Sequence, residues 1–442
     1  MRKLLLLLYL FISHLSHGQY SVSGQLVDKQ SGDPLTRAHI GIIGSDRGTV
    51  SNENGYFIFN YPSQKKNSIL KISHLGYTPI LINLSEVDSK INARFSMTKS
   101  VRELNEILIT DSEDTIKLIV RQAILSLRKN LPSKSFSAKG FYREYDKQDG
   151  KYVRLVESAV TQRDKGYDNN IHQGIKLRVD ELRKSEDNID LDWRSAISNW
   201  FYDHNGLYKL LEEDPFRKKD RASNFFERIG DYALTKDPNI VEENYGSFRF
   251  ISSKDFMEGY DFSLVETIIE DSNKYHRIKF ENPYVDKTLM VGSGELLIDS
   301  SDNMIIEFKA FLKRTNKKDG MGLILTTFQT IVSKYQYKFK KIGKKYYLYY
   351  AESMSLGSNS SIFRRNEKNY RSNESGLIYK HKQYLINKIT KNKVNRKQTM
   401  ADDDDIYNED VEYNVKFWDE YNIIVDLPLE KKLKQDLTEY ID

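Results

Sequence analysis

Six histidines follow residue 18, and histidine is the residue type that most often holds a catalytic metal ion. A zinc peptidase needs two histidines, or a histidine and a carboxylate, at a close spacing that lets both reach one ion. No two of these histidines lie within thirty residues of each other, and none has a glutamate at the next or third position. They are His39, His74, His172, His204, His276 and His381. The sequence therefore predicts no metal site.

Nucleophilic catalysis has no better support in the sequence. The Gly-x-Ser-x-Gly turn of nucleophile-elbow hydrolases is missing, and Gly292-Ser293-Gly294 opens a predicted hairpin strand instead. Ser68 and Lys71 match Ser-x-x-Lys, but on a strand two positions three apart point to opposite faces. The chain has no cysteine, which excludes disulfides, thiolate catalysis and cysteine-bound zinc, and it has no phosphate loop or dinucleotide fingerprint. We therefore expect no catalytic residue, no cofactor and no enzymatic activity.

Two further features have both a functional and a structural interpretation. The acidic run Asp402–Asp405 offers oxygen ligands to calcium, but it lacks the alternating spacing and central glycine of a calcium loop, so a solvated loop is favoured. Trp193, Ile197 and Trp200 have helical spacing. They could line a hydrophobic groove or lid, but the same spacing describes the buried stripe of an amphipathic helix, which we favour.

The N-terminus predicts export. Arg2-Lys3 is followed by the apolar run Leu4–Ile12, and Ser16-His17-Gly18 supplies the small residues that a signal peptidase reads. Leu4–Leu15 is shorter than the roughly 20 apolar residues that an uncleaved anchor needs. We therefore assign residues 1–18 to a signal peptide. The mature chain is expected to be periplasmic or outer-membrane-associated, and not transmembrane after cleavage.

Residues 19–98 alternate at the period of short β-strands, with turns between them. Asn54-Gly55 favours the positive φ angles of a tight hairpin, and Gly44–Asn52 is a predicted polar loop. The predicted strands are Tyr20–Val27, His39–Ile43, Tyr56–Asn60, Ser68–Ser73 and Pro79–Asn83. Strands at this spacing are typical of a β-sandwich.

A set of glycines and neighbouring residues makes the N-terminal pattern specific. They are Gly24-x-x-Val27-Asp28, Gly32-x-Pro34-Leu35-x-x-Ala38, Gly48–Ser51, Asn54-Gly55-x-Phe57, Ile69–Ser73 and Gly76-Tyr77. With them, residues 20–110 resemble the carboxypeptidase regulatory-like domain, a transthyretin-like sandwich common in Bacteroidetes envelope proteins. Arg37 stands where a glycine is usual, and Asn52 where an aspartate is usual. The resemblance implies an envelope location and an interaction role, and no carboxypeptidase activity.

A linker at 99–114 leads to a second domain, 115–442. An apolar face predicts a helix that ends at Leu131-Pro132, and a helical insert is predicted near 190–235. That face consists of Ile116, Ile119, Val120, Ala123, Ile124 and Leu127. The rest is predicted as long antiparallel strands: Phe136–Asp146, Tyr152–Arg163, Gly294–Asp299, Met304–Lys313, Thr326–Lys340, Lys345–Ser355 and Leu377–Ile389.

Successive long hairpins indicate a large curved antiparallel sheet, or half-barrel, with helices against its concave face. The fold class is thus mainly β, with packed helices (α+β). Phe141–Glu144 and Gly294-x-Leu296-x-Ile298-Asp299 loosely resemble the lipoprotein-carrier (LolA/LolB-like) half-barrels. Charged residues on both faces of several strands argue against a transmembrane barrel.

The charge balance excludes a nucleic-acid partner. The formal charge of +5 falls to 5 − 2 = +3 once Arg2 and Lys3 leave, among 68 basic and 63 acidic residues. Three functions remain open. We favour a non-enzymatic cell-envelope protein in which the sandwich is a docking module and the large domain binds an envelope protein or an apolar ligand. Peripheral association with the outer membrane is compatible with this function. The alternatives are a carrier of lipid or lipoprotein, which needs a continuous apolar cavity, and a hydrolase whose site is dispersed in sequence.

Overall fold

The structure of the chain is a computed structural model. It describes residues 19–45, 48–87, 92–100, 113–148, 150–164, 166, 175–185, 254–270, 273–282, 290–314, 327–360, 377–390, 399 and 406–425. The predicted signal, most of the linker, the helical insert with Trp193 and Trp200, and Asp402–Asp405 lie outside these residues. The chain forms two compact units: Met1–Ser100 with Asn414–Asp426, and Val101–Tyr413 with Leu427–Asp442.

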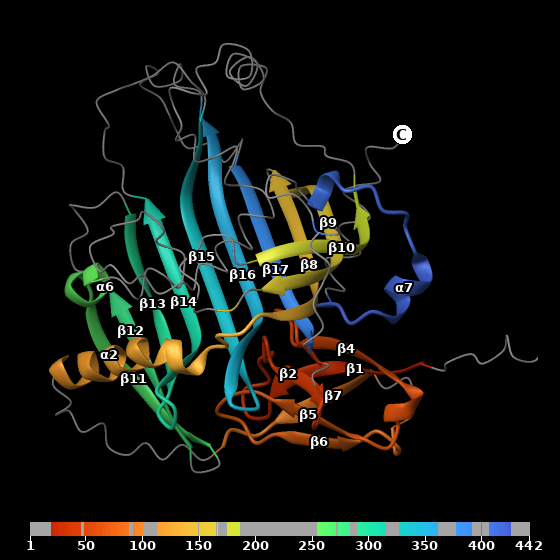
Figure 1. Ribbon diagram of the computed structural model, residues 1–442, viewed down its shortest axis with the longest axis horizontal. Helices are drawn as coiled ribbons and strands as arrows, with labels where there is room; N and C mark the ends of the chain where they lie inside the picture. Colours follow the sequence, from red (N-terminus) through yellow and green to blue (C-terminus); the bar gives the residue numbers. More distant parts are fainter. Residues whose placement is uncertain are drawn as a thin grey trace, which may run out of the picture. The chain divides into compact units, whose positions relative to one another are not determined.

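Unit 1 contains two small sheets that share one core (Figure 1). The first has the order β4 (Tyr56–Pro62), β1 (Gln19–Asp28), β7 (Asn92–Met97), in which β7 runs parallel to β1. The second has the order β3 (Gly48–Val50), β2 (His39–Ile42), β5 (Ile69–Ser73), β6 (Ile80–Asn83). Val22, Phe57 and Phe59 of the first sheet and Ile40, Leu70 and Ile72 of the second are buried together. The predicted β-sandwich is confirmed.

Two strands of unit 1 differ from the prediction. β3 lies inside the predicted loop Gly44–Asn52, and β7 follows the last predicted strand. A strand of three residues is too short to show a period. In β7, by contrast, exposed polar residues alternate with less exposed apolar ones, and Arg94 is exposed between half-buried Ala93 and Phe95. β3 is therefore revealed only by its pairing with β2, whereas β7 has a period of two that the sequence prediction did not use.

The two departures from the family pattern have local explanations. Arg37 has φ 57°, the left-handed conformation that favours the glycine usual at this position. Asn52 acts as the usual aspartate would, because its Oδ1 accepts hydrogen bonds from the backbone N–H groups of Asn54 and Tyr56, at 2.9 and 2.8 Å. Gly55 between them has φ 78°, so the predicted Asn-Gly turn is present.

The segment Asn414–Asp426 completes unit 1, although the sequence places it in the second domain. It begins with α7 (Val415–Glu420), capped by Asn414, whose side chain accepts from the N–H of Phe417 at 3.1 Å. Trp418, Ile424 and Val425 are buried. The return of this segment depends on contacts with strands some 360 residues earlier, since Asn422 bonds Asn60 across 362 positions.

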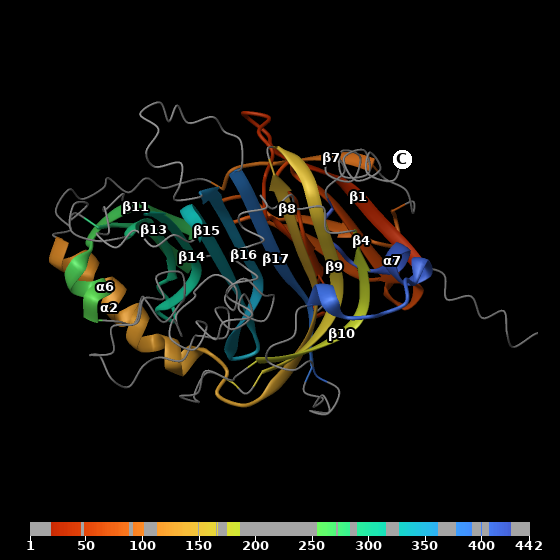
Figure 2. The ribbon, with the colours of Figure 1, turned by 90° about the horizontal axis from the view of Figure 1, so that it is seen from above.

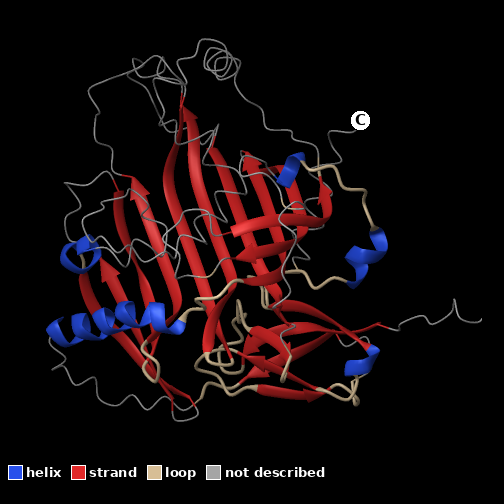
Figure 3. Ribbon diagram, viewed as in Figure 1, coloured by secondary structure: helices blue, strands red, loops and turns tan. Residues whose placement is uncertain are grey.

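The described strands of unit 2 form one ten-stranded antiparallel sheet (Figure 3). Its order is β10-β9-β8-β17-β16-β15-β14-β13-β12-β11, and the edge strands β10 and β11 do not pair with each other. The strands are β8 (Phe136–Gln148), β9 (Lys151–Asp164), β10 (Ile175–Lys184), β11 (Asp261–Glu270), β12 (Asn273–Glu281), β13 (Met290–Asp299), β14 (Met304–Arg314), β15 (Thr327–Ile342), β16 (Lys345–Ser360) and β17 (Leu377–Thr390). All predicted long strands are present, and the sheet is open, as the predicted half-barrel requires.

The helix α2 (Glu113–Asn130) packs on one face of this sheet, near α6 (Lys254–Gly259). Figure 2 shows the sheet bending toward the side on which α2 lies, and we call this side the concave face. Ile116, Val120, Ala123 and Leu127 of α2 are buried in the core, which confirms the predicted helical face. Leu118 and Leu125 point away from it and are 53% and 73% exposed.

A ladder of aromatic rings fills the concave face beside α2. The ring of Phe280 stacks on that of Phe308 with centroids 6.0 Å apart, and Phe308 stacks on Tyr337 at 5.9 Å. Phe256 of α6 meets the edge of Phe280 at 5.0 Å. Gly294 of β13 lies between the strands of Phe280 and Phe308, and a Cβ atom there would overlap the Phe280 ring. The glycine of the Gly294-x-Leu296 motif therefore makes room for the ladder.

Candidate ligand-binding face

The concave face changes polarity along its central strands. Strand register aligns one row of side chains across β14, β15, β16, β17 and β8, and this row is apolar or aromatic. Its members are Phe308, Tyr337, Ala351, Tyr384 and Tyr142, all buried in the core that includes α2. We call it the aromatic row.

Four residues further along the same strands, a second row on the same face is polar. We call it the polar row, and it consists of Ser333, Ser355, Lys380, Asp146 and Arg154, from β15, β16, β17, β8 and β9. Both rows lie on one face because side chains alternate along a strand with a period of two. The row between them is mixed, with Tyr335, Ser353, Lys382, Glu144 and Val156. Ser355, Lys380 and Arg154 are half-buried.

Glu144 has a full set of partners in this region. Its Oε2 accepts the hydroxyl of Tyr142 at 2.6 Å, and its Oε1 lies 2.8 Å from Arg154 Nη1 and 3.9 Å from Lys382 Nζ. Burial acts to raise the pKa of Glu144, but Lys382, Arg154 and the Tyr142 hydroxyl together hold that pKa below its usual value. Glu144 is therefore an ionised, paired carboxylate.

Asp146 is less well satisfied. It is 1% exposed, its Oδ2 lies 3.9 Å from Arg154 Nη1, and its Oδ1 has no hydrogen-bond partner among the described residues. Burial raises the pKa of Asp146 to about 6, opposed by Lys380 on the neighbouring strand. Burial likewise lowers the pKa of Lys380, opposed by Asp146. A buried carboxylate oxygen without a donor is costly, which marks Asp146 as a candidate binding residue.

A short C-terminal segment lies against the β9–β10 end of this face. The 3-10 turn η5 (Ile406–Asn408) places the ring of Tyr407 4.3 Å from the Arg154 guanidinium carbon. The Tyr407 hydroxyl donates to the backbone oxygen of Ser185 at 2.7 Å, and Lys184 Nζ donates to the backbone oxygen of Tyr407 at 2.7 Å. Arg154 is thus held in place by a cation–π contact with the Tyr407 ring and by its ion pair with Glu144.

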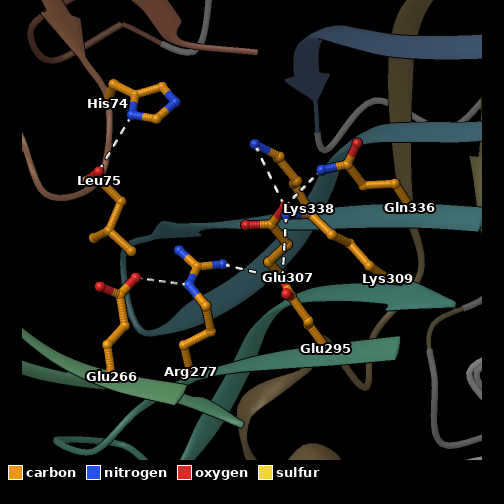
Figure 4. A network of polar contacts seen from close by, with 9 residues as sticks. All are labelled: His74, Leu75, Glu266, Arg277, Glu295, Glu307, Lys309, Gln336 and Lys338. Carbon is orange, nitrogen blue, oxygen red and sulfur yellow. Dashed lines mark hydrogen bonds and ion pairs between the residues drawn. The ribbon is translucent and has the colours of Figure 1, made fainter. Parts of the chain in front are cut away.

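The opposite face of the sheet carries ion pairs at its β11–β15 side (Figure 4). Arg277 forms ion pairs with Glu266 at 2.9 Å and with Glu295 at 3.5 Å. Glu307 forms ion pairs with Lys309 at 3.4 Å and with Lys338 at 3.7 Å. Burial tends to raise the pKa of Glu307, but Lys338 and Lys309 hold it at about 2. Charges of alternating sign across neighbouring strands stabilise the sheet, and we assign them no ligand.

A buried relay of three side chains lies on that opposite face at β8, β17 and β16. The hydroxyl of Tyr145 and Nδ1 of His381 are 2.5 Å apart, and Nε2 of His381 is 2.7 Å from Glu352 Oε1. All three residues are at most 7% exposed. Chemically, such a chain can hold and pass a proton between a phenol and a carboxylate. Sequence spacing alone does not reveal it, because His381 and Tyr145 are 236 positions apart.

The other residues singled out in the sequence are scattered. His39 and His74 belong to unit 1, where His74 Nδ1 lies 3.2 Å from the backbone oxygen of Leu75, and His276 bonds the Thr267 hydroxyl. Lys71 lies within β5 and Ser68 just before it, and Gly292–Gly294 lies within β13. His172 and His204 lie outside the described residues. Within the described part of the chain, no group of three His, Asp or Glu side chains is placed to hold a metal ion.

Sequence reasoning missed the charged residues of the concave face. Glu144 and Asp146 alternate on one predicted strand, and Lys380 and Lys382 on another, so each pair was readable as one face. What could not be read is the pairing of β8 with β17, which sets Lys382 opposite Glu144 and Lys380 opposite Asp146. Among the described helices, none combines the length and hydropathy needed to span a bilayer.

Comparison with known protein families supports the N-terminal resemblance. Residues 22–109 match the family model of the CarboxypepD_reg-like domain. This range includes β1 to β7 apart from the first residues of β1, so the match and the two-sheet fold coincide. A comparison with curated proteins finds no significant match.

Comparison with solved structures finds weak likenesses, one of them to a member of the LolA superfamily. A LolA superfamily protein from Nitrosomonas europaea is 12% identical, covers 65% of this chain and 98% of its own, and has a TM-score of 0.21. An outer membrane lipoprotein-sorting protein domain from Vibrio parahaemolyticus is 6% identical, with coverages of 65% and 96% and a TM-score of 0.24. MucB in its complex with MucA, from Pseudomonas aeruginosa, is 8% identical, with coverages of 63% and 99% and a TM-score of 0.17. All three TM-scores lie below 0.5, so these likenesses are too weak to assign a ligand or a partner to this chain.

Proposed function

We propose that this chain is an exported, non-enzymatic binding protein of the cell envelope that binds amphiphilic molecules on the concave face of its large sheet. The observation that carries the proposal is the change from the aromatic row to the polar row within four residues along β15, β16, β17 and β8. The aromatic row is buried in the core, whereas Ser355, Lys380 and Arg154 of the polar row are half-buried. An amphiphile would place its charged head on the polar row and direct its apolar chain toward the apolar end of the face.

The proposal distinguishes an amphiphile from a purely apolar ligand. A carrier for an apolar ligand alone needs a face with few charges, because an ionised group in an apolar site costs several kcal/mol unless it is paired. The concave face instead carries Lys380, Lys382, Glu144, Asp146 and Arg154 in two adjacent rows. Exposed Leu118 and Leu125 of α2 add an apolar outer surface on the same side of the sheet.

Location and docking rest on the N-terminal part of the chain. The signal pattern of residues 1–18 supports export, and the CarboxypepD_reg-like domain at residues 22–109 supports an envelope role in which unit 1 contacts another component. We assign ligand binding to unit 2 and docking to unit 1. Peripheral association with the outer membrane is part of the same proposal.

Native mass spectrometry of residues 19–442, purified from their own envelope with lipid extraction in parallel, tests this function. Ser353→Trp would fill the concave face at a half-buried position, and Met354→Trp adds the same bulk to the opposite face at the next residue. We expect wild type and Met354→Trp to retain an amphiphile and Ser353→Trp to lose it. An empty wild type, or equal occupancy of the two variants, would contradict the proposal. A co-purified polypeptide without lipid would favour the scaffold.

One observation favours a second candidate, a hydrolase. The Tyr145–His381–Glu352 relay places a proton acceptor beside a phenol oxygen in a buried site. If this relay is catalytic, purified wild type should hydrolyse activated esters and Tyr145→Phe should not. If it is structural, neither protein will be active and Tyr145→Phe will bind the amphiphile as wild type does.

A further inference from the structure

The polar row contains one carboxylate whose requirements the described residues do not meet. Glu144 has three partners, whereas Asp146, two positions along β8, has only Arg154 at 3.9 Å from its Oδ2 and no partner on Oδ1. Asp146 is 1% exposed, so bulk water does not satisfy that oxygen. An ionised carboxylate in this position favours a ligand that donates hydrogen bonds and carries positive charge.

The surroundings of Asp146 favour a negative group beside that donor. Lys380 lies directly opposite Asp146 on β17, and Arg154 lies directly opposite it on β9. Together with Lys382, three cations face two carboxylates in adjacent rows, which leaves one positive charge in excess. Lys380 and Arg154 are half-buried, so both can be reached from the concave side. One carboxylate thus lies between two cations on neighbouring strands, an arrangement that suits a small zwitterion with one positive and one negative group.

We propose that the polar row binds a head group in which a phosphate diester is followed by a primary ammonium, as in phosphoethanolamine. The ammonium donates to Asp146, and the phosphate lies against Lys380 and Arg154. This inference rests on the proposed function, because it names the head group of the amphiphile that we propose the concave face binds.

The same contacts disfavour the two commonest relatives of this head group. A trimethylammonium carries the charge but has no N–H, so it leaves Asp146 Oδ1 without a donor. A phosphoglycerol head donates only from neutral hydroxyls, and its phosphate adds a second anion near Asp146 without compensating charge. The burial that raises the pKa of Asp146 to about 6 leaves it ionised at neutral pH, and an ammonium partner relieves that cost.

The test measures binding of three lysophospholipids with the same acyl chain and different heads, by calorimetry on delipidated residues 19–442 below the critical micelle concentration. We expect lysophosphatidylethanolamine to bind about tenfold more tightly than the choline and glycerol forms, which is the worth of one charge-assisted hydrogen bond. Asp146→Asn keeps the shape of the side chain and should bring the three affinities to within about twofold of each other.

Asp164→Asn serves as the matched control. Asp164 is also buried with its pKa raised to about 6, but its carboxylate already accepts from the Gly166 N–H at 2.7 Å and from Gln162 at 3.2 Å. This variant should keep the preference for ethanolamine. The wild-type comparison of the three heads needs no variant, so a misfolded Asp146→Asn protein would not prevent a result.

The outcomes separate the head group from the proposed function. Equal binding of the three lipids by wild type, or an unchanged preference in Asp146→Asn, overturns the head-group inference and leaves amphiphile binding standing. If none of the lipids binds, the proposed function is wrong. If glycerophosphoethanolamine, which has no acyl chain, binds as tightly as the lipid, the head-group chemistry holds and the amphiphile proposal fails.

Discussion

Asn422 forms two hydrogen bonds with the backbone of Asn60, from which it is separated by 362 positions. Its Oδ1 accepts from the Asn60 N–H at 2.7 Å, and its Nδ2 donates to the Asn60 oxygen at 3.1 Å. Asn60 belongs to β4, the edge strand of its sheet. The side-chain amide therefore occupies the position of a neighbouring peptide group and covers an edge that would otherwise be open to pairing.

Replacing this amide should destabilise unit 1. Asn422→Ala leaves both polar groups of Asn60 without their partner, and we expect a loss of about 1–2 kcal/mol in the free energy of unfolding. Asn422→Asp should lose a similar amount, because a carboxylate cannot donate to the Asn60 oxygen. Urea unfolding followed by circular dichroism measures this. Asn92→Ala, at an exposed position of β7, is the control and should change stability by less than about 0.5 kcal/mol.

The raised pKa of Asp146 predicts a pH-dependent stability. Its folded-state pKa of about 6 exceeds the ordinary value of 3.8, so the protonated side chain favours the folded state below pH 4, and this contribution disappears as pH rises through 6. Relative to Asp146→Asn, wild type should lose about 2 kcal/mol of stability between pH 4 and pH 7. The groups facing Asp146, namely Glu144, Arg154, Lys380 and Lys382, are present in both proteins.

Asp302 should change the stability with pH in the opposite direction in the same experiment. Lys341 and the Tyr346 hydroxyl hold the pKa of Asp302 below its ordinary value. Its contribution is present at neutral pH and is lost as pH falls through the folded-state pKa. Wild type should therefore gain stability over Asp302→Asn as pH rises.

Parallel pH profiles for wild type and Asp146→Asn would mean that Asp146 is not desolvated as the structure indicates.

Gly294 should not tolerate a side chain. A Cβ atom at this position would overlap the Lys309 carbonyl oxygen and the Phe280 ring, both of which are fixed within the sheet core. We expect Gly294→Ala to lower the free energy of unfolding by about 3 kcal/mol. Thermal unfolding tests this against Gly259→Ala in α6, where an added Cβ meets nothing within 4 Å. Equal melting temperatures for the two variants would show that the aromatic ladder can shift.

The carboxylate of Glu157 should be among the residues most sensitive to a neutral replacement. It lies between two arginines, with Arg143 Nε and Arg183 Nε each 2.5 Å from one of its oxygens, and Glu157 and Arg143 are at most 3% exposed. Glu157→Gln leaves buried positive charge without its counterion, which typically costs about 3–5 kcal/mol. Glu281→Gln is the control, because Glu281 pairs with Lys279 at an exposed site. The denaturant midpoint of Glu157→Gln should lie clearly below that of Glu281→Gln.

Local turn chemistry made the hairpins predictable. Gly150 and Gly343 have φ 83° and 63°, and Asn303 has φ 49°, and each of these residues lies in the short connection between two predicted strands. The hairpin of β11 and β12 was missed, and its register shift between Leu264 and Glu266 explains why. A bulge moves the following side chains to the other face, so the apolar residues no longer show a period of two.

The candidate site could not be predicted from the sequence, for a different reason. Lys380 and Asp146 meet because β17 pairs with β8, two strands separated by more than 200 residues. Strand alternation predicts which side chains share a face of one strand, but it does not predict which strands are neighbours. Asn414–Asp426 joined unit 1 through side-chain hydrogen bonds and three buried apolar residues, which have no periodic pattern.

The place of β17 in the sheet sets the order in which the chain can finish folding. β8–β10 and β11–β16 are two groups of consecutive strands, and among the described strands only β17, near the end of the chain, joins them. Until residues 377–390 leave the ribosome, both β8 and β16 have an unpaired edge, and the large sheet stays in two halves. We therefore expect the largest domain of this chain to remain unclosed until almost the whole chain has been made.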